Sequence, residues 1–318
     1  MKKIISFVFI GILCFTPVTF FNIEHSVSAQ SVSNYDVAVK QGEKVKAINS
    51  LLNSAIKDED MDMIDTYYDH LATGIKTLEQ NIGKVPGATN RTKLTKTYVV
   101  PAKMTIERVI YEVSQYRLLY QIAELVDNEE VSKAESNMTK LERLKKKAIT
   151  IKQAGGYEEL PISINSNLRL FEAFLQGNIL DLRVYPYEEA IDSGKIETMN
   201  QLYDHVTKQL KLTQQRIGQV SGSKNRAEMN EYYVTPTKMT IERTIYEISQ
   251  YRLLNVISND LTKNDIESAK QRFETLNRLK DRAVKIKEAG GYDSLPVEIE
   301  QSLRNKENTL LNQIESQK

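Results

Sequence analysis

The chain has few of the residues that form reactive centres or covalent cross-links. Its 318 residues include one cysteine, three histidines and no tryptophan. The cysteine, Cys14, lies in the apolar amino-terminal stretch, so the rest of the chain cannot form an internal disulfide. The sequence contains no G-x-S-x-G elbow, no H-E-x-x-H pair and no glycine-rich phosphate loop. These absences make an enzyme the least supported class, and we predict no cofactor.

Metal-binding patterns are also lacking. His70 and His205 are the two histidines outside the amino-terminal stretch, and one histidine per 135 residues without cysteine is a poor metal site. The acidic run at residues 58–62 lacks the glycine and the terminal glutamate of a calcium loop, and it is typical of a helix start. We predict no metal site and a structural role for both histidines, such as hydrogen bonding to Asp or Tyr across helices.

The amino terminus has the pattern of a secretory signal. Lys2 and Lys3 precede an apolar run over residues 4–21, and Val27-Ser28-Ala29 offers small residues for cleavage. We predict a signal peptide at residues 1–29 and a secreted, extracellular or cell-wall-associated protein with no stable membrane insertion after cleavage. A retained anchor is the alternative, because the run is nearly long enough to span a bilayer. A lipoprotein is disfavoured because Leu13 precedes Cys14.

The charge balance argues against nucleic acid as a partner. Residues 1–29 hold two of the 43 basic and one of the 42 acidic residues, so the mature chain would carry no net charge. General nucleic-acid binders have a basic excess.

A duplication organises the chain. Residues 103–119 and 238–254 have nearly the same sequence, and 16 of 20 positions are identical between 101–120 and 236–255. The offset of 135 residues holds without a gap and is too long for a solenoid repeat. We therefore predict two homologous domains, repeat 1 over residues 30–177 and repeat 2 over residues 178–318.

The periodicity inside each repeat is helical. Apolar residues recur at spacings of three and four, and sustained strand alternation is absent. Gly155-Gly156 indicates a helix end, whereas the chain after Pro161 has a helical pattern to about Ser193, with no clear breaker between Leu168 and Val184 except Gly177. The predicted fold is all-α: two tandem antiparallel bundles of three or four helices, joined end to end by a long helix into an elongated rod.

The repeats also preserve polar residues that a core does not require. One interpretation is a polar seam, with Arg108 paired to Glu112 and tyrosine hydroxyls satisfied by neighbouring helices. The other is a ligand surface, because a tyrosine ring suits a sugar face and a guanidinium suits phosphate or carboxylate. The candidate ligand-binding residues are Arg108, Tyr111, Tyr116, Arg117, Arg143, Lys147, Arg243, Tyr246, Tyr251, Arg252, Arg278 and Arg282.

The segments Val126–Leu144 and Ile106–Leu119 resemble the amino-terminal helical region of SbsC-type S-layer proteins of Gram-positive spore-formers. That resemblance implies helical bundles that hold a protein to a secondary cell-wall polymer, an anionic glycan attached to peptidoglycan. The chain differs from that family in lacking a large β-sandwich portion, so the resemblance does not imply lattice assembly.

We therefore expect a secreted, non-enzymatic helical protein that attaches to an anionic cell-wall glycan. The alternative is an extracellular spacer or protein-protein interaction module, for which a protein would be the partner. A helical toxin component is a third reading, weakened by the lack of a long apolar hairpin in the mature chain. The sequence does not identify the ligand.

Overall fold

The computed structural model describes residues 33–316, and the predicted signal peptide lies outside them. Within that range the chain is all-α, as predicted, and contains no strand. The α-helices are α1 (Asn34–Lys57), α2 (Met61–Gly83), α3 (Ala88–Leu94), α4 (Val100–Asp127), α5 (Val131–Gly155), α6 (Ile162–Asp192), α7 (Ile196–Gly218), α8 (Ser223–Met229), α9 (Thr235–Thr262), α10 (Ile266–Gly290) and α11 (Val297–Ser316).

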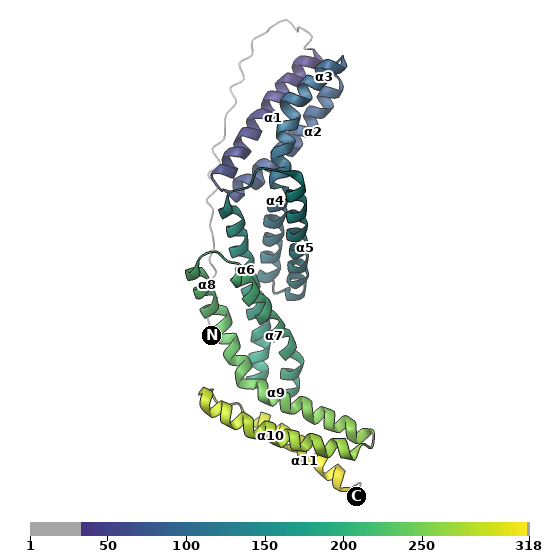
Figure 1. The fold of residues 1–318 in the computed structure, drawn as a ribbon, viewed down its shortest axis with the longest axis vertical. Helices are drawn as coiled ribbons and strands as arrows, with labels where there is room; N and C mark the ends of the chain where they lie inside the picture. The colour runs from purple at the N-terminus through teal and green to yellow at the C-terminus, as the bar shows by residue number, and fades with distance from the viewer. Residues whose placement is uncertain (1–32, 317–318) are drawn as a thin grey trace.

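The helices form a series of three-helix bundles (Figure 1). In bundle 1, α1 and α2 pack against α3 and the amino-terminal part of α4. Bundle 2 consists of the rest of α4, α5 and the beginning of α6. In bundle 3, the remainder of α6 packs against α7 and the start of α9, and bundle 4 contains the end of α9, α10 and α11. Each repeat therefore makes two successive bundles where we predicted one.

Helix α6 belongs to two bundles. Its residues Leu175 and Ile179 lie in the hydrophobic core of the amino-terminal half, while Leu180 and Val184 lie in the core of the carboxy-terminal half. The predicted continuous helix between the repeats is thus present. The predicted domain boundary, between residues 177 and 178, falls inside α6 and stays a prediction.

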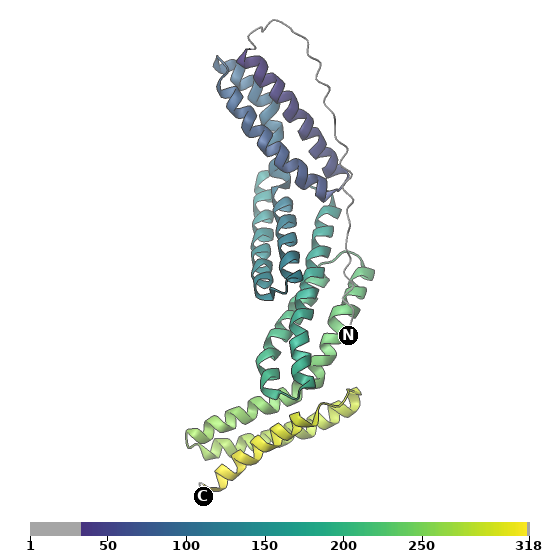
Figure 2. The same cartoon turned by 180° about the vertical axis from the view of Figure 1, so that it is seen from behind.

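The molecule is elongated, but its axis bends. Figures 1 and 2 show α1 to α3 at one end, and they show bundle 4 lying across the direction of the preceding bundles. The change of direction occurs along α9, which runs from bundle 3 into bundle 4.

A π-helical turn precedes a proline in each repeat. The turns at Thr95–Val99 and Asn230–Val234 connect α3 to α4 and α8 to α9, so each pair forms one nearly continuous helix. Pro101 and Pro236 are the second residues of α4 and α9, two positions after the end of each π turn. Proline lacks an N–H and clashes with the carbonyl four residues earlier, and a π turn widens the helix at that point. The long helices therefore accommodate the prolines next to a widened π turn.

Gly177 admits a tyrosine ring to the backbone of α6. A Cβ atom added there would lie 2.6 Å from Cε2 and from Cζ of Tyr233, which is closer than real Cβ atoms approach. The Tyr233 hydroxyl donates to Oδ1 of Asn178 at 2.8 Å. Gly42 holds Tyr98 in the same way in repeat 1. The glycine is required for close packing rather than as a helix breaker.

Candidate functional site

Arg108 and Arg243 fix the connections after α5 and α10. The Arg108 guanidinium donates to the carbonyl oxygens of Glu158 and Glu159 at 3.0 and 2.7 Å, and it pairs with the Glu158 carboxylate at 3.0 Å. Arg243 donates to the equivalent carbonyls, of Asp293 and Ser294, at 3.0 and 2.6 Å. The expected pair between Arg108 and Glu112 is wrong, because the guanidinium reaches a loop 50 residues away. Both arginines therefore stabilise the connection that follows a helix, α5 for Arg108 and α10 for Arg243.

Arg117 and Arg252 connect the long helices to α2 and α7. Arg117 pairs with Asp65 at 2.5 Å and Asp69 at 2.8 Å, and its guanidinium carbon lies 5.5 Å from the centre of the Tyr68 ring. Arg252 donates to Asn200 at 2.6 Å and Asp204 at 3.0 Å. These internal pairs correspond to the polar-seam interpretation of the repeated arginines.

The tyrosines of the set are half-buried, and two of them have different surroundings in the two repeats. The Tyr116 hydroxyl donates to Asp62, and its ring contacts that of Tyr120 at 4.8 Å between centres. In repeat 2, Tyr251 instead lies beneath the ammonium group of Lys306, 5.0 Å from the ring centre. The half-buried Tyr111 and Tyr246 occupy matching places on α4 and α9.

Four of the predicted residues lie on exposed helix surfaces. Arg143 and Lys147 are on α5, while Arg278 and Arg282 are on α10. Arg143, Lys147 and Arg282 have no hydrogen bond or ion pair with any residue in the described range, whereas Arg278 donates weakly to Thr275 at 3.2 Å. The structure thus divides the predicted set into arginines with internal partners and half-buried tyrosines on α4 and α9, and exposed bases on α5 and α10.

A network of four charged side chains connects the two repeats. Lys145 of α5 contacts Glu142 and Glu172 at 3.0 and 2.7 Å, and Arg216 of α7 contacts the same two carboxylates at 2.9 and 2.8 Å. Burial alone would raise the pKa of Glu142, but Lys145 and Arg216 hold it below its ordinary value. The equivalent of Glu142 in repeat 2 is Asn277, so this arrangement is specific to the junction.

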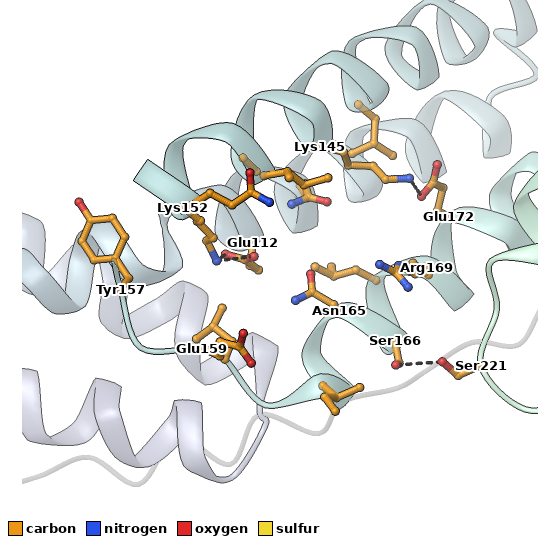
Figure 3. Close-up of a pocket in the computed structure, with 18 of the residues that line it drawn as sticks. Glu112, Lys145, Lys152, Tyr157, Glu159, Asn165, Ser166, Arg169, Glu172 and Ser221 are labelled. Atoms are coloured by element: carbon orange, nitrogen blue, oxygen red, sulfur yellow. Dashed lines mark hydrogen bonds and ion pairs between the residues drawn. The ribbon is translucent and has the colours of Figure 1, made fainter. Parts of the chain in front are cut away.

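A cleft of about 660 Å³ opens beside this junction. Its walls come from α4, α5, the beginning of α6 and the α5–α6 connection, and Ser221 of the α7–α8 connection closes one side (Figure 3). On that side, the hydroxyl oxygens of Ser221 and Ser166 lie 3.0 Å apart and form a hydrogen bond. At the opposite wall, Lys152 donates to both oxygens of Glu112 at 2.6 Å. Burial raises the pKa of Glu112 despite the opposing effect of Lys152.

Sequence reasoning missed the cleft residues Asn165 and Arg169 on α6. Figure 3 shows the Asn165 amide pointing toward the pair of Glu112 and Lys152, with Arg169 one turn farther along. The available signal was a difference between the repeats rather than an identity. Residue 165 is asparagine, whereas its counterpart Glu300 is acidic.

The histidine prediction is wrong. His70 and His205 are exposed on α2 and α7, and neither forms a hydrogen bond with another described residue. In the described part of the chain, no three or more His, Cys, Asp or Glu side chains are placed to hold a metal ion. Within residues 33–316, none of the helices combines the length and apolar character that a membrane span requires.

Comparison with known proteins identifies a family for most of the chain. The family described as SbsC C-terminal domain matches residues 23–103 and 123–238. The sequence resemblance to the SbsC family is confirmed, although the matching domain is described as carboxy-terminal and we had named the amino-terminal region. No curated protein and no solved structure matches the chain. The chain belongs to the SbsC C-terminal domain family, a structural S-layer family rather than an enzyme family, which gives it an S-layer or cell-wall-related role.

Proposed function

We propose that the protein is a secreted, non-enzymatic attachment module that binds an anionic secondary cell-wall polymer through the exposed bases of α5 and α10. The observation that carries the proposal is that Arg143, Lys147 and Arg282 have no hydrogen bond or ion pair with any described residue, and that Arg278 bonds only to the Thr275 hydroxyl. Residues 139–152 hold six basic residues and one acidic residue, and residues 274–287 hold five basic and two acidic residues. Arg143 and Lys147 have counterparts in Arg278 and Arg282 at the same positions of repeat 2.

The local charge explains how a chain without net charge can bind a polyanion. The arginines of α4 and α9 already have carboxylate or carbonyl partners, so binding through them would require those contacts to break. The exposed bases of α5 and α10 can meet phosphate or carboxylate groups without that cost. Two such surfaces on one chain would raise retention by avidity, provided that one polymer spans both.

The test is co-sedimentation of the mature protein with purified sacculi that carry the polymer. Wild-type protein is compared with a variant in which the four exposed bases Arg143, Lys147, Arg278 and Arg282 are replaced by Gln. We expect wild-type binding that weakens with salt, because exposed charges are screened, and a large loss in the variant.

A matched control removes the same number of positive charges elsewhere. Lys40 and Lys44 of α1 and Lys208 and Lys211 of α7 are also exposed, and replacing these four with Gln leaves the α5 and α10 surfaces unchanged. The control variant is expected to bind like wild type. Equal loss in both variants would show that binding depends only on overall charge, and full binding by the α5 and α10 variant would refute the proposed surface.

A second candidate is an extracellular helical spacer or protein-interaction module. The internal bonding of Arg108, Arg117, Arg243 and Arg252 favours it, because these preserved residues then serve packing alone. A protein with this function would show no affinity for sacculi with or without polymer.

A further inference from the structure

The cleft beside the junction of the repeats has features of a specific ligand site. Its volume of about 660 Å³ falls in the range of about 300 to 1,000 Å³ that is typical of small-molecule pockets. It combines apolar surface, including the exposed Ile149 and Ile162, with a few polar side chains from separate elements. Because Ser221 of repeat 2 closes a cleft built by repeat 1, the site depends on the junction.

The charged residues of the cleft divide into satisfied and free groups. Glu112 is bonded to Lys152, and Glu172 is bonded to Lys145. By contrast, the Arg169 guanidinium has no hydrogen bond or ion pair among residues 33–316, and it is exposed at the cleft. The Glu159 carboxylate, on the connection into α6, is also free within the same range.

A comparison with repeat 2 explains why Arg169 is free. Its counterpart, Arg304, forms an ion pair with Glu300 at 2.5 Å, one helical turn earlier. In repeat 1 the residue one turn earlier is Asn165, which has no charge to offer. The difference between Asn165 and Glu300 thus leaves Arg169 without an ion-pair partner among the described residues, whereas Arg304 has one.

We propose that this cleft binds one sugar residue that carries an anionic group, with the anion on Arg169. A guanidinium presents two parallel donors to a carboxylate or phosphate. The Asn165 amide and the Glu159 carboxylate can bond sugar hydroxyl groups, and Ile149 and Ile162 offer apolar contact to a sugar ring. The inference rests on the proposed function, because it names the unit of the wall polymer that the protein recognises.

The free carboxylate decides between a sugar and a simple anion. Inorganic phosphate would gain the charge of Arg169 but would leave Glu159 unused and would be repelled by it. An acidic sugar supplies hydroxyl donors to Glu159 together with an anion for Arg169. The cleft faces away from the exposed bases: Lys145, Ile149 and Lys152 line it, whereas Arg143 and Lys147 lie half a turn around α5. The two surfaces can therefore be tested separately.

The experiment is NMR titration of the mature, isotope-labelled protein with galacturonic acid, galactose 6-phosphate, galactose and inorganic phosphate. We expect saturable shifts near Asn165 with one of the two acidic sugars, which distinguishes a carboxylate from a phosphate ligand. Galactose and inorganic phosphate should bind at least about tenfold more weakly, the factor expected for loss of one charge-assisted contact. Equal binding of inorganic phosphate, or no binding of either acidic sugar, would overturn the assignment.

The repeats supply matched variants. Asn165→Glu copies repeat 2. The new carboxylate should pair with Arg169, replace the amide contact to the sugar and repel the anion, and together these effects should weaken acidic-sugar binding at least about tenfold while the fold is retained. Arg169→Ala should have the same effect, and Arg304→Ala should have none. Unchanged affinity in Asn165→Glu and Arg169→Ala would refute the site.

Sacculus binding separates this inference from the proposed function. If Asn165→Glu loses acidic-sugar binding and also weakens sedimentation with sacculi, the cleft recognises the polymer. If wild-type protein sediments with sacculi but binds neither acidic sugar, the cleft assignment fails while the proposed attachment stands. Binding of an acidic sugar without any sacculus binding would support the cleft as a sugar site and overturn its role on the wall.

Discussion

Replacement of Gly177 by alanine should destabilise the protein, although alanine is the better helix former. Gly177 lies within α6, where intrinsic propensity alone would make the change stabilising by about 1 kcal/mol. The added methyl group, however, would meet three atoms of the Tyr233 ring at 2.6 to 2.7 Å. Tyr233 is only 4% exposed and cannot swing into solvent without breaking its packing.

The expected change in the free energy of unfolding is the balance of two losses and one gain. Overpacking of a well-filled core costs roughly 1 to 3 kcal/mol. Displacement of the ring would also remove the hydrogen bond to Asn178, which contributes about 1 kcal/mol. After the gain in helix propensity is subtracted, we expect a net loss of about 1 to 3 kcal/mol in the free energy of unfolding, measured by urea denaturation.

Two controls isolate the clash. Gly83 and Gly218 end α2 and α7, and a Cβ atom at either position would meet no atom within 4 Å. Alanine at these positions should be neutral or mildly stabilising. In addition, Gly177→Ala should cost little in a Tyr233→Leu background, because the ring that it strikes is gone. Stabilisation by Gly177→Ala in the wild-type background would refute the packing argument.

Three further predictions concern the charged contacts. Arg216→Gln should lower the free energy of unfolding by about 2 kcal/mol, because Glu172 is only 3% exposed and loses one of its two cationic partners. Thermal unfolding measures this loss, and an unchanged midpoint temperature would contradict the prediction. Because the pKa of Glu142 is lowered in the folded state, its stabilising effect is present above the ordinary value of 4.5 and is lost as the pH falls through the lowered value. The Glu142→Gln variant should therefore have a lower free energy of unfolding than wild type at pH 6, but it should lose less of that free energy when the pH falls below 4.5. If the free energies of unfolding of the two proteins change in parallel with pH, Glu142 does not have this role. Arg243→Ala should speed amide hydrogen exchange in residues 292–295 with little effect on α7. Unchanged exchange in residues 292–295 would show that the guanidinium does not hold the connection.

The helices could be predicted from the sequence because their signals are local. For α6, the apolar spacing and the lack of a breaker other than Gly177 between Leu168 and Val184 were sufficient, and the helix also includes Pro186. The division of each repeat into two bundles could not be predicted, because periodicity does not indicate which part of a long helix contacts which neighbour. Helices α4 and α9 are 28 residues long and each serves two bundles.

The candidate site was harder to predict because identity between repeats preserves both packing and function. Arg108 is repeated as Arg243, yet both guanidinium groups hold carbonyl oxygens of a connection 50 residues away in sequence. Spacing within one helix suggested Glu112 as the partner instead. The free Arg169 could be found only by asking where the repeats differ, at residues 165 and 300.

The most direct test of wall attachment is co-sedimentation of the mature protein with sacculi before and after chemical removal of their attached polymer, over a salt series. Our account predicts binding that requires the polymer, weakens as salt rises, and is lost when Arg143, Lys147, Arg278 and Arg282 are replaced by Gln. Binding that is indifferent to polymer removal, or no binding to any sacculus preparation, would contradict it.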